Sequence, residues 1–322
     1  MLAAVATGID PADPLAGLEI REAPEPERPA GWEVVNVRAA ALNHHDLWTL
    51  RGVGAGPHDL PVILGCDAAG VAEDGREVIL YSVLSEPGPD GDETLVQDFR
   101  QLSERGVDGT LAERVAVPAR NLVPKPPSLS FAEAACLPVA YLTAYRMLFM
   151  RGGLRPGDSV LVQGAGGGVA TAAIVLAHAA GIRVYATSRD ERKRERAVEI
   201  GAEAAVPPGG RLPERVDAVI ETVGRATWDH SLKSLRPGGR VVVSGATSGG
   251  DPPADLQRVF WRQLTVVGSS MGTLDELRRL ATLVETTGLR PVIDSEHTLA
   301  EARGAFERLA SGESFGKIVV TP

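Results

Sequence analysis

Hydrophobic and polar positions alternate in two different ways along the chain. Up to residue 123 the apolar runs are short and rich in β-branched residues, as in residues 33–41 and 78–83, and clusters of Gly, Pro and Asp separate them. Runs of this kind predict short strands joined by turns. The pattern changes at the proline-dense residues 121–127, after which Ser130 and Glu133 form a capping-box pattern that opens an apolar helix. We therefore expect a β-rich first domain over residues 1–123.

Strand-like and helix-like segments alternate in the remainder of the chain. Apolar strands are expected at residues 159–163, 183–187, 218–221, 240–244 and 264–268, and helices at 169–180, 191–200, 228–235, 274–286 and 299–310, with a closing strand at 317–320. Continuous apolar strands separated by amphipathic helices predict a parallel sheet that is covered on both faces. The chain as a whole is therefore expected to be an α/β protein.

Composition and charge narrow the class of protein. The 322 residues are 44% hydrophobic and 23% charged, and no apolar run approaches the roughly 18 residues that a membrane span requires. A net charge of −9 opposes binding to nucleic acid. The N-terminal residues lack the basic segment of a signal peptide, so we expect a soluble cytoplasmic protein that binds no membrane. The two cysteines, Cys66 and Cys136, exclude a disulfide framework and a four-thiolate zinc site.

The strongest chemical signal is a glycine-rich turn between an expected strand and an expected helix. Its residues are Gly164, Gly166, Gly167, Gly168, Val169 and Ala170. Gly164, Gly167 and Ala170 hold the three spaced positions of the dinucleotide-binding fingerprint. A turn without Cβ atoms lets backbone N–H groups and the positive end of a helix meet a pyrophosphate. The turn therefore predicts a bound dinucleotide, and the alternative is an ordinary strand-to-helix turn.

The residues after the next strand indicate which dinucleotide is bound. NAD-binding chains carry an acidic residue about 20 residues beyond the glycine turn, where it contacts the ribose 2′-hydroxyl. This chain has Ser188 there, followed by Arg189, with Lys193 nearby. Since no carboxylate repels a 2′-phosphate and two cations can pair with it, NADPH is the expected cofactor. The alternative is that Arg189 and Lys193 belong to a solvated, charge-balanced helix face.

Polar and titratable residues also gather in the first domain. They are Asn43, His44, His45 and Asp46, followed some twenty residues later by Cys66 and Asp67. On composition alone, two His, two Asp and a Cys could form a zinc site.

The whole chain resembles the medium-chain dehydrogenase/reductase superfamily. The resemblance is carried, in the family's order, by ALNHHDLWTLRG, LPVILGCDAAGV, DGTLAERVAVPARNLVPKP, EAACLPVAYLTAYRML, the glycine turn, SLKSLRPGGRVVVSGATSG, FWRQLTVVGSSMGT and FGKIVV. It implies a GroES-like catalytic domain over residues 1–123 and a Rossmann domain with a doubly wound parallel sheet over residues 124–264. Residues 265–322 would add an edge strand to that sheet and return to the catalytic domain.

The resemblance also implies that a metal is missing. Zinc-dependent members carry ligands at the positions of Asn43, Cys66 and Val139, and only Cys66 can donate here. The four cysteines of the family's structural zinc lobe are absent from residues 85–99. The chain therefore resembles zinc-less quinone reductases, and no metal is expected. The alternative is a zinc site rebuilt from Cys66, His45 and Asp67.

Further roles are implied by the resemblance. Asn43 would lie at the nicotinamide and the substrate, His44 near the pyrophosphate, and Asp46 would fix the loop. His45 could donate a proton, since its ordinary pKa lies near neutrality, or it could be a packed or solvent-facing histidine. Trp48 would form an aromatic wall of the site or belong to the core. The residues implied at the nicotinamide end are Thr143, Gly245, Ala246, Ser269, Ser270 and Met271, and those flanking the dinucleotide are Thr222, Val223 and Gly224. Lys317 matches the family without an implied role.

These features predict an NADPH-dependent, zinc-independent reductase whose small-molecule substrate is a quinone or an α,β-unsaturated carbonyl compound. A conjugated acceptor spreads the incoming negative charge, so hydrogen bonds and a later proton transfer can replace a Lewis acid. The alternatives are an alcohol dehydrogenase or ketone reductase with a non-standard metal site, and an NADPH-binding protein without turnover. The apolar strand at 264–268 is expected at the sheet edge, where pairing with its copy would give a homodimer.

Overall fold

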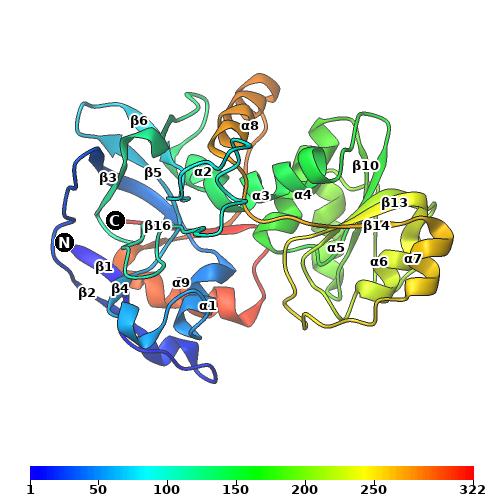
Figure 1. Cartoon of the computed structure of the whole chain (residues 1–322), viewed down its shortest axis with the longest axis horizontal. Helices are drawn as coiled ribbons and strands as arrows, with labels where there is room; N and C mark the ends of the chain where they lie inside the picture. Colours follow the sequence, from blue (N-terminus) through cyan, green and yellow to red (C-terminus); the bar gives the residue numbers. More distant parts are fainter. The chain divides into compact units, whose positions relative to one another are not determined.

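A computed structural model describes all 322 residues, which divide into two compact units. The first unit comprises Met1–Ala140 and Thr273–Pro322, and the second comprises Tyr141–Gly272. The chain therefore leaves the first unit once and returns to it, and both termini lie in that unit (Figure 1). None of the helices is long and apolar enough to cross a membrane.

The first unit is rich in β-structure. A three-stranded sheet has the order β2-β1-β4, and a larger sheet has the order β15-β16-β3-β5-β6-β8, with β7 paired to β3. The strands are β1 (Leu2–Ala6), β2 (Leu18–Glu22), β3 (Trp32–Ala41), β4 (Val62–Ile63), β5 (Asp67–Ala72), β6 (Glu77–Leu80), β7 (Arg114–Pro118), β8 (Leu122–Pro124), β15 (Ile293–Thr298) and β16 (Lys317–Thr321). The helices of this unit are α1 (His44–Leu50), α2 (Phe131–Ala135), α8 (Leu274–Thr287) and α9 (Ala302–Ser311).

The core of the first unit joins segments from both ends of the chain. Val35 and Val37 of β3 alternate with exposed residues, as expected for a strand with one buried face. They belong to one apolar cluster with Leu50 of α1 and Phe306 of α9. The closing strand β16 pairs antiparallel with the end of β3 and parallel with β15. This pairing places Lys317 next to the residues that directly follow β3.

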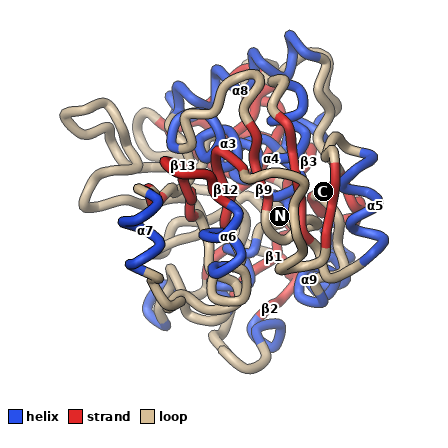
Figure 2. The backbone as a smooth tube through the Cα atoms, turned by 90° about the vertical axis from the view of Figure 1, so that its right-hand side faces the viewer, coloured by secondary structure: helices blue, strands red, loops and turns tan.

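The second unit contains a six-stranded parallel sheet with the order β11-β10-β9-β12-β13-β14. Its strands are β9 (Ser159–Val162), β10 (Arg183–Thr187), β11 (Ala204–Val206), β12 (Val216–Glu221), β13 (Leu235–Val243) and β14 (Thr265–Gly268), and its helices are α3 (Leu142–Tyr145), α4 (Gly168–Ala179), α5 (Glu191–Glu199), α6 (Trp228–Ser234) and α7 (Leu256–Arg262). Helices separate most of these strands along the chain, except β11 and β12, which follow each other directly (helices blue and strands red in Figure 2). The strand order reverses between β9 and β12, and in such sheets ligands bind at the carboxyl ends of the strands beside the reversal.

The structure confirms the α/β class, the parallel sheet and the edge position of β14. The two units divide later in the chain than residues 123 and 264, because α2 packs on β3 and β5 of the first unit and the segment after β14 still belongs to the second. Sequence patterns missed β15, whose residues are mostly polar and only half-buried. Its backbone pairing with β16 makes it a strand, and hydrophobic alternation cannot reveal such a pairing.

Candidate functional site

The glycine turn of the second unit forms an open cradle at the carboxyl end of β9. Gly164 and Gly166 have φ angles of +73° and +134°, which side chains other than glycine rarely adopt. A Cβ on Gly164 would lie 2.7 Å from Cγ2 of Val223. A Cβ on Gly167, the N-cap of α4, would meet nothing within 4 Å, and no side chain caps the helix. The free N–H groups and the positive end of α4 can therefore receive a pyrophosphate.

Buried polar side chains hold the glycine turn in place through hydrogen bonds. Gln163 accepts a hydrogen bond from Oγ1 of Thr187 (2.6 Å) and donates one to Oγ of Ser231 (3.0 Å). The N–H of Gly164 in turn donates to Thr187 Oγ1 at 3.2 Å. Sequence reasoning missed Gln163, although a polar residue that ends an apolar strand is a usable signal for such a role.

Glu221 holds the backbone that follows β12 in a similar way. Its carboxylate is fully buried and accepts hydrogen bonds from the backbone N–H groups of Val223 (2.8 Å) and Gly224 (2.9 Å). The hydroxyls of Thr227 and Ser231 also donate to it. The carboxylate thus fixes the backbone of residues 222–224. Sequence reasoning missed Glu221, the last residue of β12, as it missed Gln163, the residue that follows β9.

The predicted 2′-phosphate residues lie beside the glycine turn. Ser188 directly follows β10, and the N–H of Ala165 donates to the carbonyl of Thr187 at 2.7 Å. Arg189 is exposed, whereas Ser188 is buried. Nη1 of Arg194 donates to the carbonyls of Ser188 (2.9 Å) and Arg189 (3.2 Å), which fixes this loop. Lys193 lies in the first turn of α5, where Asp190 caps its N–H.

The remaining cofactor residues predicted for the second unit follow the carboxyl ends of its strands, with one exception. Thr222, Val223 and Gly224 come after β12, Gly245 and Ala246 after β13, and Ser269, Ser270 and Met271 after β14. The exception is Thr143, which is buried in α3. The hydroxyl of Ser269 is buried without a hydrogen-bond partner.

In the first unit, Lys317 is the centre of a buried polar network. Its ammonium group donates to Asp67 Oδ2 (2.8 Å), to Asn43 Oδ1 (2.6 Å) and to the carbonyl of Leu42 (2.7 Å). Asn43 Nδ2 donates to the same Asp67 oxygen at 2.9 Å, and the N–H of Val139 donates to the other oxygen at 2.7 Å. Burial raises the pKa of Asp67, and the Lys317 charge opposes that rise. Lys317, which had no implied role, therefore orients Asn43 and neutralises Asp67.

Asp46 ties α1 to the turn at Gly65. It is fully buried, and its two oxygens accept hydrogen bonds from the N–H groups of Asn43 (2.7 Å) and Gly65 (3.1 Å). Burial raises the pKa of Asp46, and the neighbouring His45 opposes the rise. The role in fixing the loop that the resemblance implied for Asp46 stays a prediction. Of the two other residues implied in this segment, His44 is exposed and Trp48 is half-buried.

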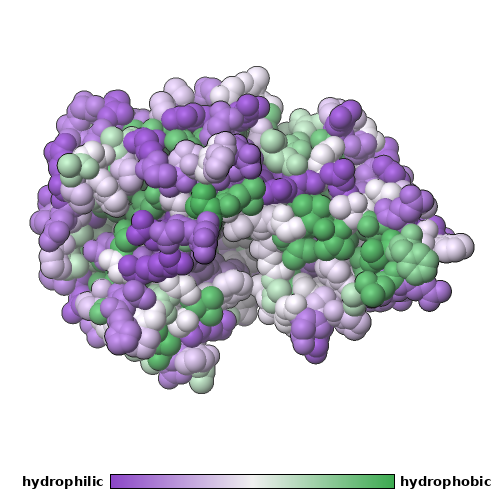
Figure 3. Space-filling model, in the orientation of Figure 1, coloured by the Kyte–Doolittle hydropathy of each residue, from purple (hydrophilic) through white to green (hydrophobic).

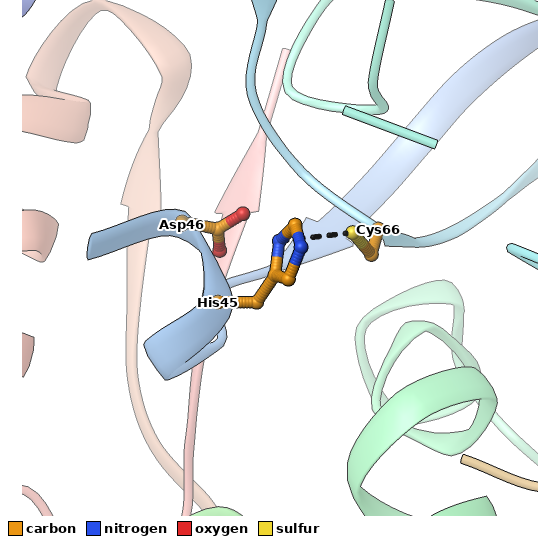
Figure 4. A group of neighbouring side chains, drawn as sticks. All are labelled: His45, Asp46 and Cys66. Atoms are coloured by element: carbon orange, nitrogen blue, oxygen red, sulfur yellow. Dashed lines mark hydrogen bonds between the residues drawn. The ribbon is translucent and has the colours of Figure 1, made fainter. Parts of the chain in front are cut away.

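His45 lies between Cys66 and Glu104. Its Nδ1 is 3.5 Å from the Cys66 sulfur, as drawn in Figure 4, and its Nε2 is 2.8 Å from Oε1 of Glu104. Burial alone would lower the pKa of His45, but Cys66, Glu104 and Asp46 raise it well above its usual value. Burial raises the pKa of the Cys66 thiol, and the neighbouring His45 opposes that rise. Burial would likewise raise the pKa of Glu104, but its hydrogen bonds with His45 and Gln101 lower it.

The residues at the family's zinc positions do not suit a catalytic zinc ion. Val139 has an apolar side chain, and the amide oxygen of Asn43, the atom that could ligate, already accepts a hydrogen bond from the Lys317 ammonium group at 2.6 Å. Cys66 alone could ligate, whereas a catalytic zinc needs three protein ligands.

A second group of possible ligands is made up of His45, Asp46 and Cys66, whose ligand atoms lie within 4.8 Å of one another. Both Asp46 oxygens already accept backbone hydrogen bonds, and His45 is paired with Glu104. The alternative site of Cys66, His45 and Asp67 is wrong in its third member, because Asp67 pairs with Lys317 instead.

Comparisons with known proteins place this geometry in context. The model of the alcohol dehydrogenase GroES-like domain matches residues 29–127, and that of the zinc-binding dehydrogenase matches residues 168–286. An acryloyl-coenzyme A reductase from Metallosphaera sedula is 31% identical over 95% of this chain and 96% of that protein. The crystal structure of an NAD-dependent alcohol dehydrogenase is 34% identical and has a TM-score of 0.92, with all of both chains covered. A 2-octenoyl-CoA carboxylase reductase in complex with NADP and 2-octenoyl-CoA is 26% identical, has a TM-score of 0.91, and is matched over 99% of this chain and 87% of that one.

Proposed function

The chain belongs to the medium-chain dehydrogenase/reductase superfamily, and from that premise we propose that it is an NADPH-dependent reductase of conjugated carbonyl compounds that needs no catalytic metal. One observation carries the proposal. Where a zinc ion would require ligands, Asn43 and Asp67 are closed into a network with Lys317, while a histidine paired with a carboxylate lies close by.

The cofactor follows from the second unit. NADPH, when bound, supplies a hydride from its nicotinamide ring. The glycine turn and the N-terminus of α4 bind the pyrophosphate, and Arg189 and Lys193 pair with the 2′-phosphate. The residues proposed around the nicotinamide are Thr143, Gly245, Ala246, Ser269, Ser270 and Met271, with Thr222, Val223 and Gly224 flanking the dinucleotide. A relative bound to NADP supports this choice, whereas the NAD-dependent relative makes Arg189 the residue to test.

The acceptor class follows from the first unit. A simple ketone develops full negative charge on one oxygen, which usually requires a metal or a strong donor. In an α,β-unsaturated carbonyl the charge spreads over the conjugated system, and one later proton transfer completes the reduction. The acryloyl-coenzyme A and 2-octenoyl-CoA relatives support an enone or enoyl thioester over a quinone.

His45 is the proposed proton donor. Its Nε2 is 2.8 Å from the Glu104 carboxylate, and its side chain is 19% exposed, so solvent can reach it. Asn43 and Trp48 are proposed to line the acceptor site, and Asp46 to hold the loop that carries them. His44 is proposed to lie near the pyrophosphate.

The test is an assay with protein that has been dialysed against a chelator. We expect NADPH oxidation, followed at 340 nm, with acryloyl- or crotonyl-type thioesters and with simple enones. The matched saturated ketones should give no turnover. If no conjugated acceptor in a broad panel, quinones included, supports NADPH oxidation, the proposed function is wrong.

The cluster of His45, Asp46 and Cys66 favours one rival, an alcohol dehydrogenase that recruits a metal ion. That rival predicts stoichiometric zinc by elemental analysis and loss of activity after chelation. Under our proposal, elemental analysis finds no stoichiometric metal and the chelator leaves the rate unchanged.

We also propose that the second unit pairs with its copy to form a homodimer. β14 is an edge strand with an exposed Val266 (48%), and α7 beside it exposes Phe260 (66%) and Trp261 (77%). Figure 3 shows apolar surface where Figure 1 labels α7 and β14. An apolar edge strand invites pairing with an identical strand. Light scattering that finds only a 33.8 kDa species would reject the dimer.

A further inference from the structure

His230 of α6 lies between the glycine turn and the loop that joins β11 to β12. The carbonyl oxygen of Gly210, in that loop, is 2.9 Å from Nε2 of His230. On the other side of the ring, the amide nitrogen of Gln163 is 3.1 Å from Nδ1. His230 therefore connects the Gly210 loop to Gln163, the residue that follows β9.

The Gly210 carbonyl fixes the position of the proton on the His230 ring. A carbonyl oxygen can only accept a hydrogen bond, so Nε2 of His230 carries the hydrogen that it donates to Gly210. In the neutral ring Nδ1 is then an acceptor, and the amide nitrogen of Gln163 donates to it. The amide oxygen of Gln163 consequently faces Thr187, whose hydroxyl donates to it at 2.6 Å.

Glu221 sets the same orientation of the Gln163 amide from another direction. Its carboxylate accepts the hydroxyl hydrogen of Ser231 at 2.6 Å. The Ser231 oxygen therefore acts as an acceptor toward Gln163, whose amide nitrogen is 3.0 Å away. Gln163 is fully buried, and its nitrogen donates one hydrogen to Ser231 and the other to His230. The Gly210 carbonyl and the Glu221 carboxylate thus require one and the same orientation.

The orientation of the Gln163 amide determines how the glycine turn is held. Because the amide oxygen accepts the Thr187 hydrogen, the lone pairs of the Thr187 hydroxyl can accept from the N–H of Gly164, at 3.2 Å. The N–H of Ala165 donates to the backbone carbonyl of the same threonine at 2.7 Å. With the amide reversed, its nitrogen would face Thr187 and compete with the Gly164 N–H for the threonine oxygen.

We propose that His230 is a positioning residue for the cofactor: through Gln163 and Thr187 it holds the glycine turn in the conformation that receives the pyrophosphate. This inference rests on the cofactor site of the proposed function, to which it adds a residue outside the dinucleotide-binding fingerprint. Because the pyrophosphate is common to both dinucleotides, His230 supports the binding of NADPH and of NADH alike. Arg189, by contrast, is expected to affect NADPH alone.

Two substitutions of His230 separate its two contacts. An asparagine oxygen can take the place of Nδ1, so His230→Asn keeps an acceptor for Gln163 and loses the donor to Gly210. A glutamine nitrogen can take the place of Nε2, so His230→Gln keeps the donor to Gly210 and loses the acceptor for Gln163. Only His230→Gln therefore leaves a buried amide hydrogen of Gln163 without its partner.

The readout is the dissociation constant of each dinucleotide, measured by isothermal titration calorimetry on folded protein. We expect His230→Gln to raise Kd for both NADPH and NADH about fivefold or more, because the Gln163 amide and the turn are no longer held in place. His230→Asn should keep both constants within about twofold of the wild-type values. The matched control, Lys233→Met, removes an exposed side chain from the same helix and should change neither constant.

A double variant tests the route through Gln163. Gln163→Met removes the amide, and adding His230→Gln to it should raise Kd no further, since His230 then has no amide to orient. A second measurement uses the wild-type protein and does not require His230→Gln to fold. Nitrogen NMR of histidine-labelled protein at pH 8 should show a protonated Nε2 and an unprotonated Nδ1 on His230, with His230→Asn used to assign the signal.

The outcomes distinguish this inference from the proposed function. Wild-type affinity in His230→Gln, equal losses in His230→Gln and His230→Asn, a further loss in the double variant, or a proton on Nδ1 would each overturn the role of His230. A loss for NADPH alone would overturn it as well, because the turn serves both dinucleotides. If wild-type protein binds NADPH but reduces no conjugated acceptor, only the proposed function fails. If it binds neither dinucleotide, both fail together.

Discussion

Replacing Lys317 by methionine tests the buried network most directly. The ammonium group is only 2% exposed, and its three hydrogens are donated to Asp67, Asn43 and the Leu42 carbonyl. Lys317→Met keeps most of the side-chain volume, so the change is mainly electrostatic. It leaves the fully buried Asp67 without its counter-charge.

The magnitude follows from that burial. Removing one partner of a buried ion pair costs about 3–5 kcal/mol, because the remaining charge is desolvated and uncompensated. For a domain of this size the loss corresponds to a fall in Tm on the order of 10 °C. Adding Asp67→Asn removes the orphaned charge, and we expect the double variant to recover about 2 kcal/mol.

The pH dependence has a definite sign. Burial already raises the pKa of Asp67, and loss of the Lys317 charge raises it further. A carboxyl group whose pKa is higher in the folded state than in the unfolded state destabilises the fold at pH above its folded pKa. The destabilisation is relieved as pH falls through that pKa. Lys317→Met should therefore lose less stability at pH 5 than at pH 8.

The assay is urea unfolding followed by tryptophan fluorescence and circular dichroism at both pH values. The control, Lys233→Met, removes an exposed lysine that pairs with Asp229 on α6. We expect it to lower the free energy of unfolding by only about 0.5 kcal/mol. A loss below about 1 kcal/mol for Lys317→Met, or a double variant as unstable as the sum of the single variants, would refute the reasoning.

Three further predictions concern the cofactor, the His45 pair and the dimer. In a fluorescence titration, Arg189→Ala should weaken NADPH binding about tenfold and leave NADH binding unchanged, because one charge-assisted pair with the 2′-phosphate is lost. An unchanged preference for NADPH over NADH would show that the 2′-phosphate is bound elsewhere. Glu104→Gln should cost about 2 kcal/mol at pH 6. The raised pKa of His45 and the lowered pKa of Glu104 make the pair fully ionised there, and the loss should shrink above the folded pKa of His45; equal losses at pH 6 and pH 10 would contradict this. If the chain forms the proposed homodimer, Val266→Arg should give a monomer in light scattering, and a dimer that persists in this variant would mean that β14 is not the interface.

Local patterns in the sequence predicted most of the second unit, although they missed the edge strand β11 and the helix α7. The strand, glycine turn and helix from Ser159 to Ala179 are contiguous, and their apolar runs predicted the parallel sheet and its edge. The missing acid and the presence of Arg189 likewise lie within a few residues of β10. Such features are decided by backbone conformation and periodicity over short stretches, so a single sequence carries them.

The polar contacts of the first unit depended on the tertiary structure. Lys317 and Asp67 are 250 residues apart, and only the pairing of β16 with β3 brings them together. Glu104 and His45 are 59 residues apart, and a segment with two left-handed residues joins them. Hydrophobic periodicity predicts which residues are buried. It does not predict which side chain pairs with a buried charge, because that partner can lie on any strand or loop that the fold brings close. The sequence by itself therefore determined the cofactor fold, and the tertiary structure decided which charges are neutralised and which side chains contact His45.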